Sequence, residues 1–68
     1  MKNIRCLYTR HFGISLDIDD NDKYYHVKVY GSWNRETDEL MSVTTDKFEY
    51  ANEIFKQLED DLRNSYAV

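Results

Sequence analysis

Proline is absent from this chain of 68 residues, and glycine (two residues) and cysteine (one residue) are scarce. One cysteine excludes an internal disulfide and a zinc site built from cysteines alone, and it is typical of a reducing compartment. Two glycines leave nothing from which to build a glycine-rich phosphate loop. No apolar run approaches the ~18 residues of a membrane span, and charges interrupt the segment where a signal peptide would have its apolar centre. We therefore expect a cytoplasmic protein.

The length and the charge balance narrow the function classes further. A chain of 68 residues forms one small domain, 1–68, and is too short for the folds of most enzymes. Its 13 acidic and nine basic residues give a net charge of −4. Residues 1–35 carry six basic and four acidic side chains (6 − 4 = +2), whereas residues 36–68 carry three and nine (3 − 9 = −6). The acidic excess disfavours nucleic-acid binding, which depends on Lys and Arg at phosphates.

Alternating apolar and polar residues predict four β-strands, over residues 2–9, 12–19, 23–31 and 39–45. The pattern is clearest in the second strand, where Phe12, Ile14 and Leu16 alternate with glycine, serine and aspartate. A run of aspartate and asparagine follows at residues 19–22. These side chains bond their own backbone, so the run predicts a tight turn.

The C-terminal third predicts a helix. Asp46 followed by Glu49 is the spacing of a capping box, so Asp46 is expected to be the N-cap. Apolar residues then recur at steps of three and four over residues 48–62, which indicates an amphipathic helix. It is expected to extend over about 18 residues and to end near Arg63 or Asn64.

The expected fold is therefore a two-layer α+β domain of order ββββα. Short connections favour an antiparallel four-stranded meander with one C-terminal helix packed on one face. One helix covers only one face of such a sheet, so the other face must meet water or a partner. The apolar stripe of the helix and one face of the strands form the expected core. Its members are Phe12, Ile14, Leu16, Ile18, Tyr25, Val27, Val29, Phe48, Ala51, Phe55, Leu58 and Leu62.

The acidic turn resembles the start of a calcium-binding EF-hand loop only in part. Asp17, Asp19 and Asn21 have the correct spacing, but the loop also needs glycine at its sixth position and glutamate at its twelfth. Those positions hold Asp22 and Lys28, and an ammonium group cannot bind calcium. We interpret the segment as a hairpin turn.

The remaining candidates for chemistry are Cys6, His11 and His26. They lack the paired spacing of zinc ligands. A Cys–His nucleophilic pair would also need an orienting group and a pocket, for which a two-layer fold of this length has little volume. We therefore expect no catalytic residues, no metal and no cofactor, and predict that the protein is not an enzyme.

A first candidate surface is the sheet face that the helix leaves open. Aromatic and basic residues alternate on the outward side of the third strand, and alternation places Arg5 and Leu7 of the first strand on the same side. The candidate residues are Arg5, Tyr24, His26, Lys28 and Tyr30. Interleaved rings and cations bind single-stranded nucleic acid. The same surface also suits a protein contact, including a second copy of the chain, and tyrosine is common on ordinary half-wet strands.

A second candidate surface is acidic. Its members are Glu36, Asp38, Glu39, Glu49, Glu53 and Asp60. Such residues usually form a solvated face, but spaced carboxylates can also imitate phosphates and occupy a basic groove on another protein.

The function expected first is protein binding without catalysis. It would be that of a small inhibitor or adaptor, of the kind encoded by phages and mobile elements, acting on a nucleic-acid-handling protein. Nucleic-acid binding at the sheet face is the alternative, and a dimerising accessory role is the third. No membrane partner is expected.

Overall fold

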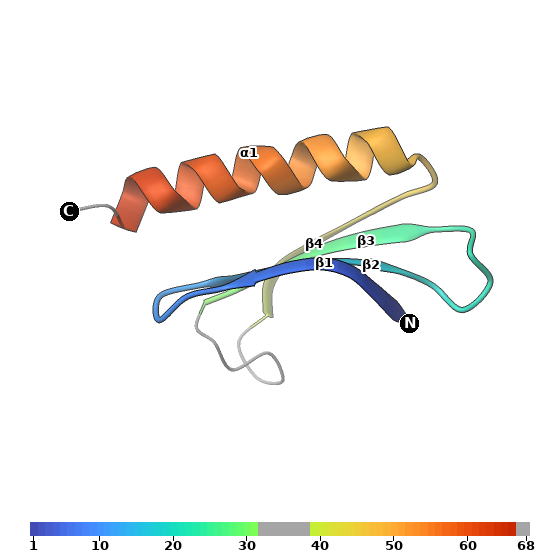
Figure 1. Ribbon diagram of the computed structural model, residues 1–68, viewed down its shortest axis with the longest axis horizontal. Helices are drawn as coiled ribbons and strands as arrows, with labels where there is room; N and C mark the ends of the chain where they lie inside the picture. The colour runs from blue at the N-terminus through green and yellow to red at the C-terminus, as the bar shows by residue number, and fades with distance from the viewer. Residues whose placement is uncertain (32–38, 67–68) are drawn as a thin grey trace.

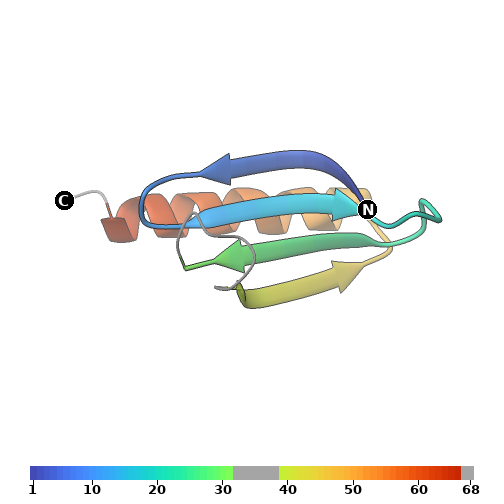
Figure 2. The same cartoon turned by 90° about the horizontal axis from the view of Figure 1, so that it is seen from below.

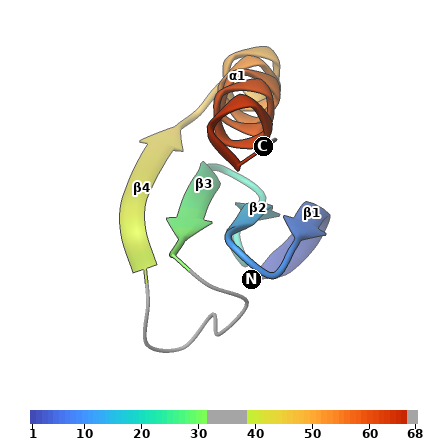
Figure 3. The ribbon, with the colours of Figure 1, turned by 90° about the vertical axis from the view of Figure 1, so that its left-hand side faces the viewer.

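The computed structural model describes residues 1–31 and 39–66. The elements are β1 (Lys2–Tyr8), β2 (Gly13–Ile18), β3 (Tyr25–Tyr30), β4 (Glu39–Thr45) and α1 (Phe48–Tyr66). The four strands lie in chain order, each antiparallel to the next, and α1 lies along one face of the sheet (Figure 1, Figure 2). Viewed from its end, the molecule has two layers (Figure 3). The predicted ββββα fold is confirmed. In the described part of the chain, no helix is apolar over the length that a membrane crossing requires.

The strand register lines up apolar side chains beneath α1. Leu16 of β2 lies opposite Val27 of β3, and Val27 lies opposite Val43 of β4. Side chains at directly opposed positions share one face of an antiparallel sheet. Leu16 and Val27 are fully buried, so this row faces the helix.

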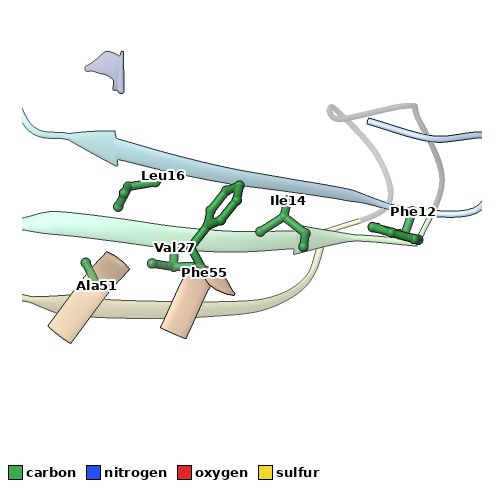
Figure 4. Close-up of a cluster of buried hydrophobic side chains, with 6 residues drawn as sticks. All are labelled: Phe12, Ile14, Leu16, Val27, Ala51 and Phe55. Carbon is green, nitrogen blue, oxygen red and sulfur yellow. The ribbon is translucent and has the colours of Figure 1, made fainter. Parts of the chain in front are cut away.

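The core is a cluster from the two central strands and the inner stripe of α1. Its buried members are Phe12, Ile14, Leu16, Val27, Ala51 and Phe55, drawn in Figure 4. All six are predicted by the periodicity. Leu58 and Leu62, also predicted, are half-buried and pack against this cluster, together with Tyr25. Val29 is buried as expected, and Ile18 is half-buried.

Phe48 is the core prediction that proves wrong, since its side chain is 42% exposed. It occupies the first position of α1, at the end of the sheet where β3 begins. There its ring contacts the ring of Tyr25 edge-on, at 5.5 Å between centroids. Helical spacing puts Phe48 on a face shared with core residues, but it does not show that the sheet ends below it.

Hydrogen bonds to the side chain of Asp19 close the β2–β3 turn. Its Oδ1 accepts the backbone N–H of Lys23 at 2.9 Å and that of Asn21 at 3.2 Å. Asp22 adopts a positive φ of 56°, a conformation that aspartate tolerates better than most residues. The hydrogen bond from Lys23 is the main cause that lowers the pKa of Asp19 from 3.8. The acidic run therefore works as the predicted turn.

Both ends of α1 differ from the prediction. The first intrahelical bond runs from the N–H of Ala51 to the carbonyl of Lys47 (3.1 Å), which makes Lys47 the N-cap and corrects the expectation for Asp46. At the other end the helix continues to Tyr66, beyond the predicted Asn64. The Tyr66 ring packs on the β1–β2 connection, and this tertiary contact is absent from any local pattern.

Candidate interaction surfaces

Arg5 and Leu7 lie on the helix side of the sheet, so the prediction that they share the open face is wrong. The Arg5 guanidinium carbon is 4.5 Å from the centroid of the Phe55 ring. Leu7 packs against the core, while Ile4 of the same strand is 44% exposed. Alternation defines two sides of an edge strand but cannot say which faces inward. Here the long stem of Arg5 covers the edge of the core.

Arg5 also connects β1 to the helix through polar contacts. Its Nη1 donates to Oδ1 of Asn52 at 3.1 Å, and its Nη2 lies 3.7 Å from Oε1 of Glu59. The other oxygen of Glu59 accepts a hydrogen bond from Nε of Arg63 at 3.1 Å. One carboxylate therefore lies between two guanidinium groups. The spacing of Glu59 and Arg63, four residues apart on one helix, predicts their contact, and it is confirmed. The contacts of Arg5 with α1 were not predicted, because they join distant segments of the chain.

The open sheet face does not assemble the predicted aromatic and basic surface. Tyr30 is only 7% exposed, so its ring is not accessible for stacking. The Lys28 ammonium group lies 3.7 Å from a Glu39 carboxylate oxygen, and the His26 ring bonds to Oγ1 of Thr44 at 3.0 Å. Tyr24 is accessible at 41%, but it precedes β3 and lies at one end of the sheet. Leu7, Tyr24 and Tyr30, which alternation places on one side of the sheet, therefore form no continuous exposed patch.

The acidic surface is also divided. Glu39 lies at the start of β4, in the sheet layer, and contacts Lys28. Glu36 and Asp38 lie outside the described residues. Glu49, Glu53 and Asp60 are exposed on α1. Three members therefore remain to form a common acidic face.

Glu49, Glu53 and Asp60 form one stripe along α1, which we call the acidic stripe. Intervals of four and seven residues place side chains on the same side of a helix. The stripe faces away from the buried side chains of Ala51 and Phe55. Among residues 1–31 and 39–66, none of the three carboxylates forms an ion pair. Lys56 occupies the same stripe, between Glu53 and Asp60.

The candidate metal ligands do not meet. Cys6 is an exposed thiol on β1. The His11 ring stacks on Tyr66, and the Asp17 carboxylate accepts hydrogen bonds from the Asn3 amide and the Ser15 hydroxyl. In the parts of the chain that the structure describes, no group of three His, Cys, Asp or Glu side chains could hold a metal ion.

A cleft at the C-terminal end of α1 has no counterpart in the sequence analysis. It has a volume of about 370 Å³ and is lined by Thr9, His11, Phe12, Arg63 and Tyr66. These residues come from the β1–β2 connection and the last turn of the helix. Since more than 50 residues separate the two segments, no local spacing could have indicated the cleft.

Comparisons of this chain with protein-family models, with curated proteins and with solved structures found no match.

Proposed function

We propose that this protein is a non-enzymatic binding domain that uses the acidic stripe of α1 to occupy a basic groove on a nucleic-acid-handling protein. The observation that supports this function is the alignment of Glu49, Glu53 and Asp60 on one exposed helix side, without ion pairs among the described residues. Exposed carboxylates without ion pairs on a rigid element are a suitable counterpart for clustered Lys and Arg.

The spacing of the stripe is compatible with imitation of phosphates. A helix rises ~1.5 Å per residue, so successive members of the stripe lie ~6 Å and ~10 Å apart along the axis. One strand of duplex DNA carries a charge every ~3.4 Å along its axis, so the intervals correspond to about two and three phosphate steps. A groove that binds DNA phosphates would therefore meet carboxylates at compatible positions.

Glu49 also has a structural use, because an acidic side chain in the first turn interacts favourably with the helix dipole. Glu53 and Asp60 lie beyond the first turn, so this effect does not account for them. The nucleic-acid alternative has weaker support, since Lys28 contacts Glu39, Tyr30 is buried, and Arg5 faces the helix.

The test compares two variants with the same change of charge. One reverses the stripe (Glu49→Lys, Glu53→Lys and Asp60→Lys). The control reverses three exposed acidic residues elsewhere (Asp20→Lys, Asp46→Lys and Asp61→Lys). Each protein is immobilised and exposed to a nuclease-treated cell lysate, and bound protein is then eluted with duplex DNA.

We expect the wild type and the control to retain nucleic-acid-binding proteins that duplex DNA releases, and the stripe variant to lose them. For a partner identified in this way, the association rate should fall steeply as salt shortens the Debye length from ~10 Å to ~3 Å. Lys56→Gln should raise that rate, because it removes the cation within the stripe. Equal capture by both triple variants, or an association rate independent of salt, would refute the proposal.

A further inference from the structure

The cleft at the end of α1 combines an apolar lining with a small number of polar groups. Its volume of about 370 Å³ falls within the ~300–1,000 Å³ typical of sites for small molecules. Phe12 is buried beneath it, whereas Tyr66 is 48% exposed. The cleft lies at the end of the molecule opposite the start of the helix, and Arg63 in its lining follows Asp60 of the acidic stripe by three residues.

Three aromatic rings meet at this cleft. The His11 and Tyr66 rings are nearly parallel, with centroids 4.9 Å apart and 4° between their planes. The Phe12 and Tyr66 centroids are 5.8 Å apart, with 22° between the planes. The faces that these rings turn toward each other are covered, so the aromatic surface that a planar ligand can reach is the exposed part of Tyr66.

The β1–β2 connection is held firmly beside these rings. The Thr9 hydroxyl accepts the N–H groups of His11 and Phe12, at 3.2 and 3.1 Å. The Thr9 N–H donates to the carbonyl of Phe12 at 2.8 Å. The side of the cleft formed by the connection therefore has a fixed shape before any ligand arrives.

Arg63 supplies the positive charge in the lining of the cleft. Its Nε donates to Glu59, which fixes the guanidinium plane, while its two terminal nitrogens have no partner within residues 1–31 and 39–66. Arg5 shares the Glu59 carboxylate, so the two guanidinium groups and one carboxylate carry a net charge of +1. Arg10 adds a positive charge in the adjacent connection. Asp60 and Asp61 in the preceding turn balance these charges, so the feature that favours an anion is the Arg63 guanidinium group itself and not the charge of this end of the molecule.

We infer that this cleft binds a small aromatic carboxylate, with the carboxylate on the terminal nitrogens of Arg63 and the ring against Tyr66, above the buried Phe12. A guanidinium group binds a carboxylate through two parallel hydrogen bonds, a geometry that an ammonium group does not offer. One guanidinium group matches one carboxylate, and the apolar walls select a ring over an acetate-sized ligand. The site is independent of the protein-binding function proposed above.

The probes are benzoate and benzamide, which have the same shape and differ in charge. Each is titrated into the full chain while backbone amide shifts are followed by NMR. Benzoate should give saturable shifts confined to residues 9–12 and 63–66. Benzamide should bind about tenfold more weakly, since it cannot accept the charge-assisted pair of hydrogen bonds.

Two variants with the same change of charge locate the site. Arg63→Gln should weaken benzoate binding to the level of benzamide, whereas Lys56→Gln, seven residues earlier on α1 and outside the cleft lining, should leave it unchanged. Tyr66→Ser should weaken both probes, because it removes an aromatic wall. Equal affinity for the two probes, shifts spread over the whole sheet, or wild-type affinity in Arg63→Gln would each overturn the inference. The folded state of each variant is checked in the same spectra.

Discussion

The position of Arg5 leads to a prediction that tests which side of β1 faces the helix. If Arg5 faced the open side of the sheet, its removal would leave folding almost unchanged, because single exposed charges contribute little. In the structure it lies over Phe55, donates to Asn52 and approaches Glu59. Its removal should therefore destabilise the protein measurably.

The expected loss of unfolding free energy follows from the three contacts of Arg5. A partly exposed cation–π contact contributes ~0.5–1 kcal/mol, the hydrogen bond to Asn52 ~0.5–1.5 kcal/mol and a partly exposed ion pair ~0.2–1 kcal/mol. The contacts share one side chain that is 43% exposed, so we take the lower part of their sum. Arg5→Met, which keeps an apolar stem, should cost ~1–2 kcal/mol. Arg5→Ala should cost more, because it also uncovers the core edge.

Urea unfolding followed by circular dichroism measures this loss. A chain of this length has a total stability of only ~3–10 kcal/mol, and a change of ~1 kcal/mol shifts the melting temperature by ~4–8 °C. Lys28→Met is the matched control, since it removes one ion-paired charge on the opposite face and should cost under ~1 kcal/mol. If Arg5→Met and Lys28→Met were both as stable as the wild type, the assignment of Arg5 to the helix side would be wrong.

Four further predictions concern the core, the turn, metals and the sheet edge. Leu58→Ala should lower the free energy of unfolding in urea by ~2 kcal/mol, which is the low end for a core leucine because Leu58 is half-buried. An unaltered unfolding curve would contradict the assignment of Leu58 to the side of α1 that packs on the sheet. The pKa of Asp19 is lowered on folding, so its stabilisation is present above pH 3.8 and lost as the pH falls through the folded-state pKa. Acid titration of Asp19→Asn should therefore show a smaller loss of stability below pH 3.8 than that of the wild type. EDTA should leave the melting temperature unchanged, and a drop of several degrees would reveal a bound metal. Edge strand β4 carries no charge from Leu40 to Thr45, so Ser42→Lys should reduce any association seen by light scattering at high concentration.

The order of the elements was determined by the sequence alone, because it depends on local periodicity. Alternation through Phe12, Ile14 and Leu16 shows which side of that strand faces the core, since only one side is apolar. The three- and four-residue spacing from Ala51 to Leu62 likewise defines a single inward stripe. These two patterns supplied five of the six residues of the buried cluster, and the alternation in β3 supplied the sixth, Val27.

The tertiary structure decided which side of β1 faces inward, where α1 ends and which polar groups meet. On β1 both sides carry apolar residues, so the choice between Leu7 and Ile4 was made by packing against β2 and the helix. In the last turn of α1 the Tyr66 ring stacks on His11, and the contact of Arg5 with Glu59 depends on the same layer packing. Contacts between segments distant in the chain form only when the layers pack, so the local spacing of residues cannot predict them.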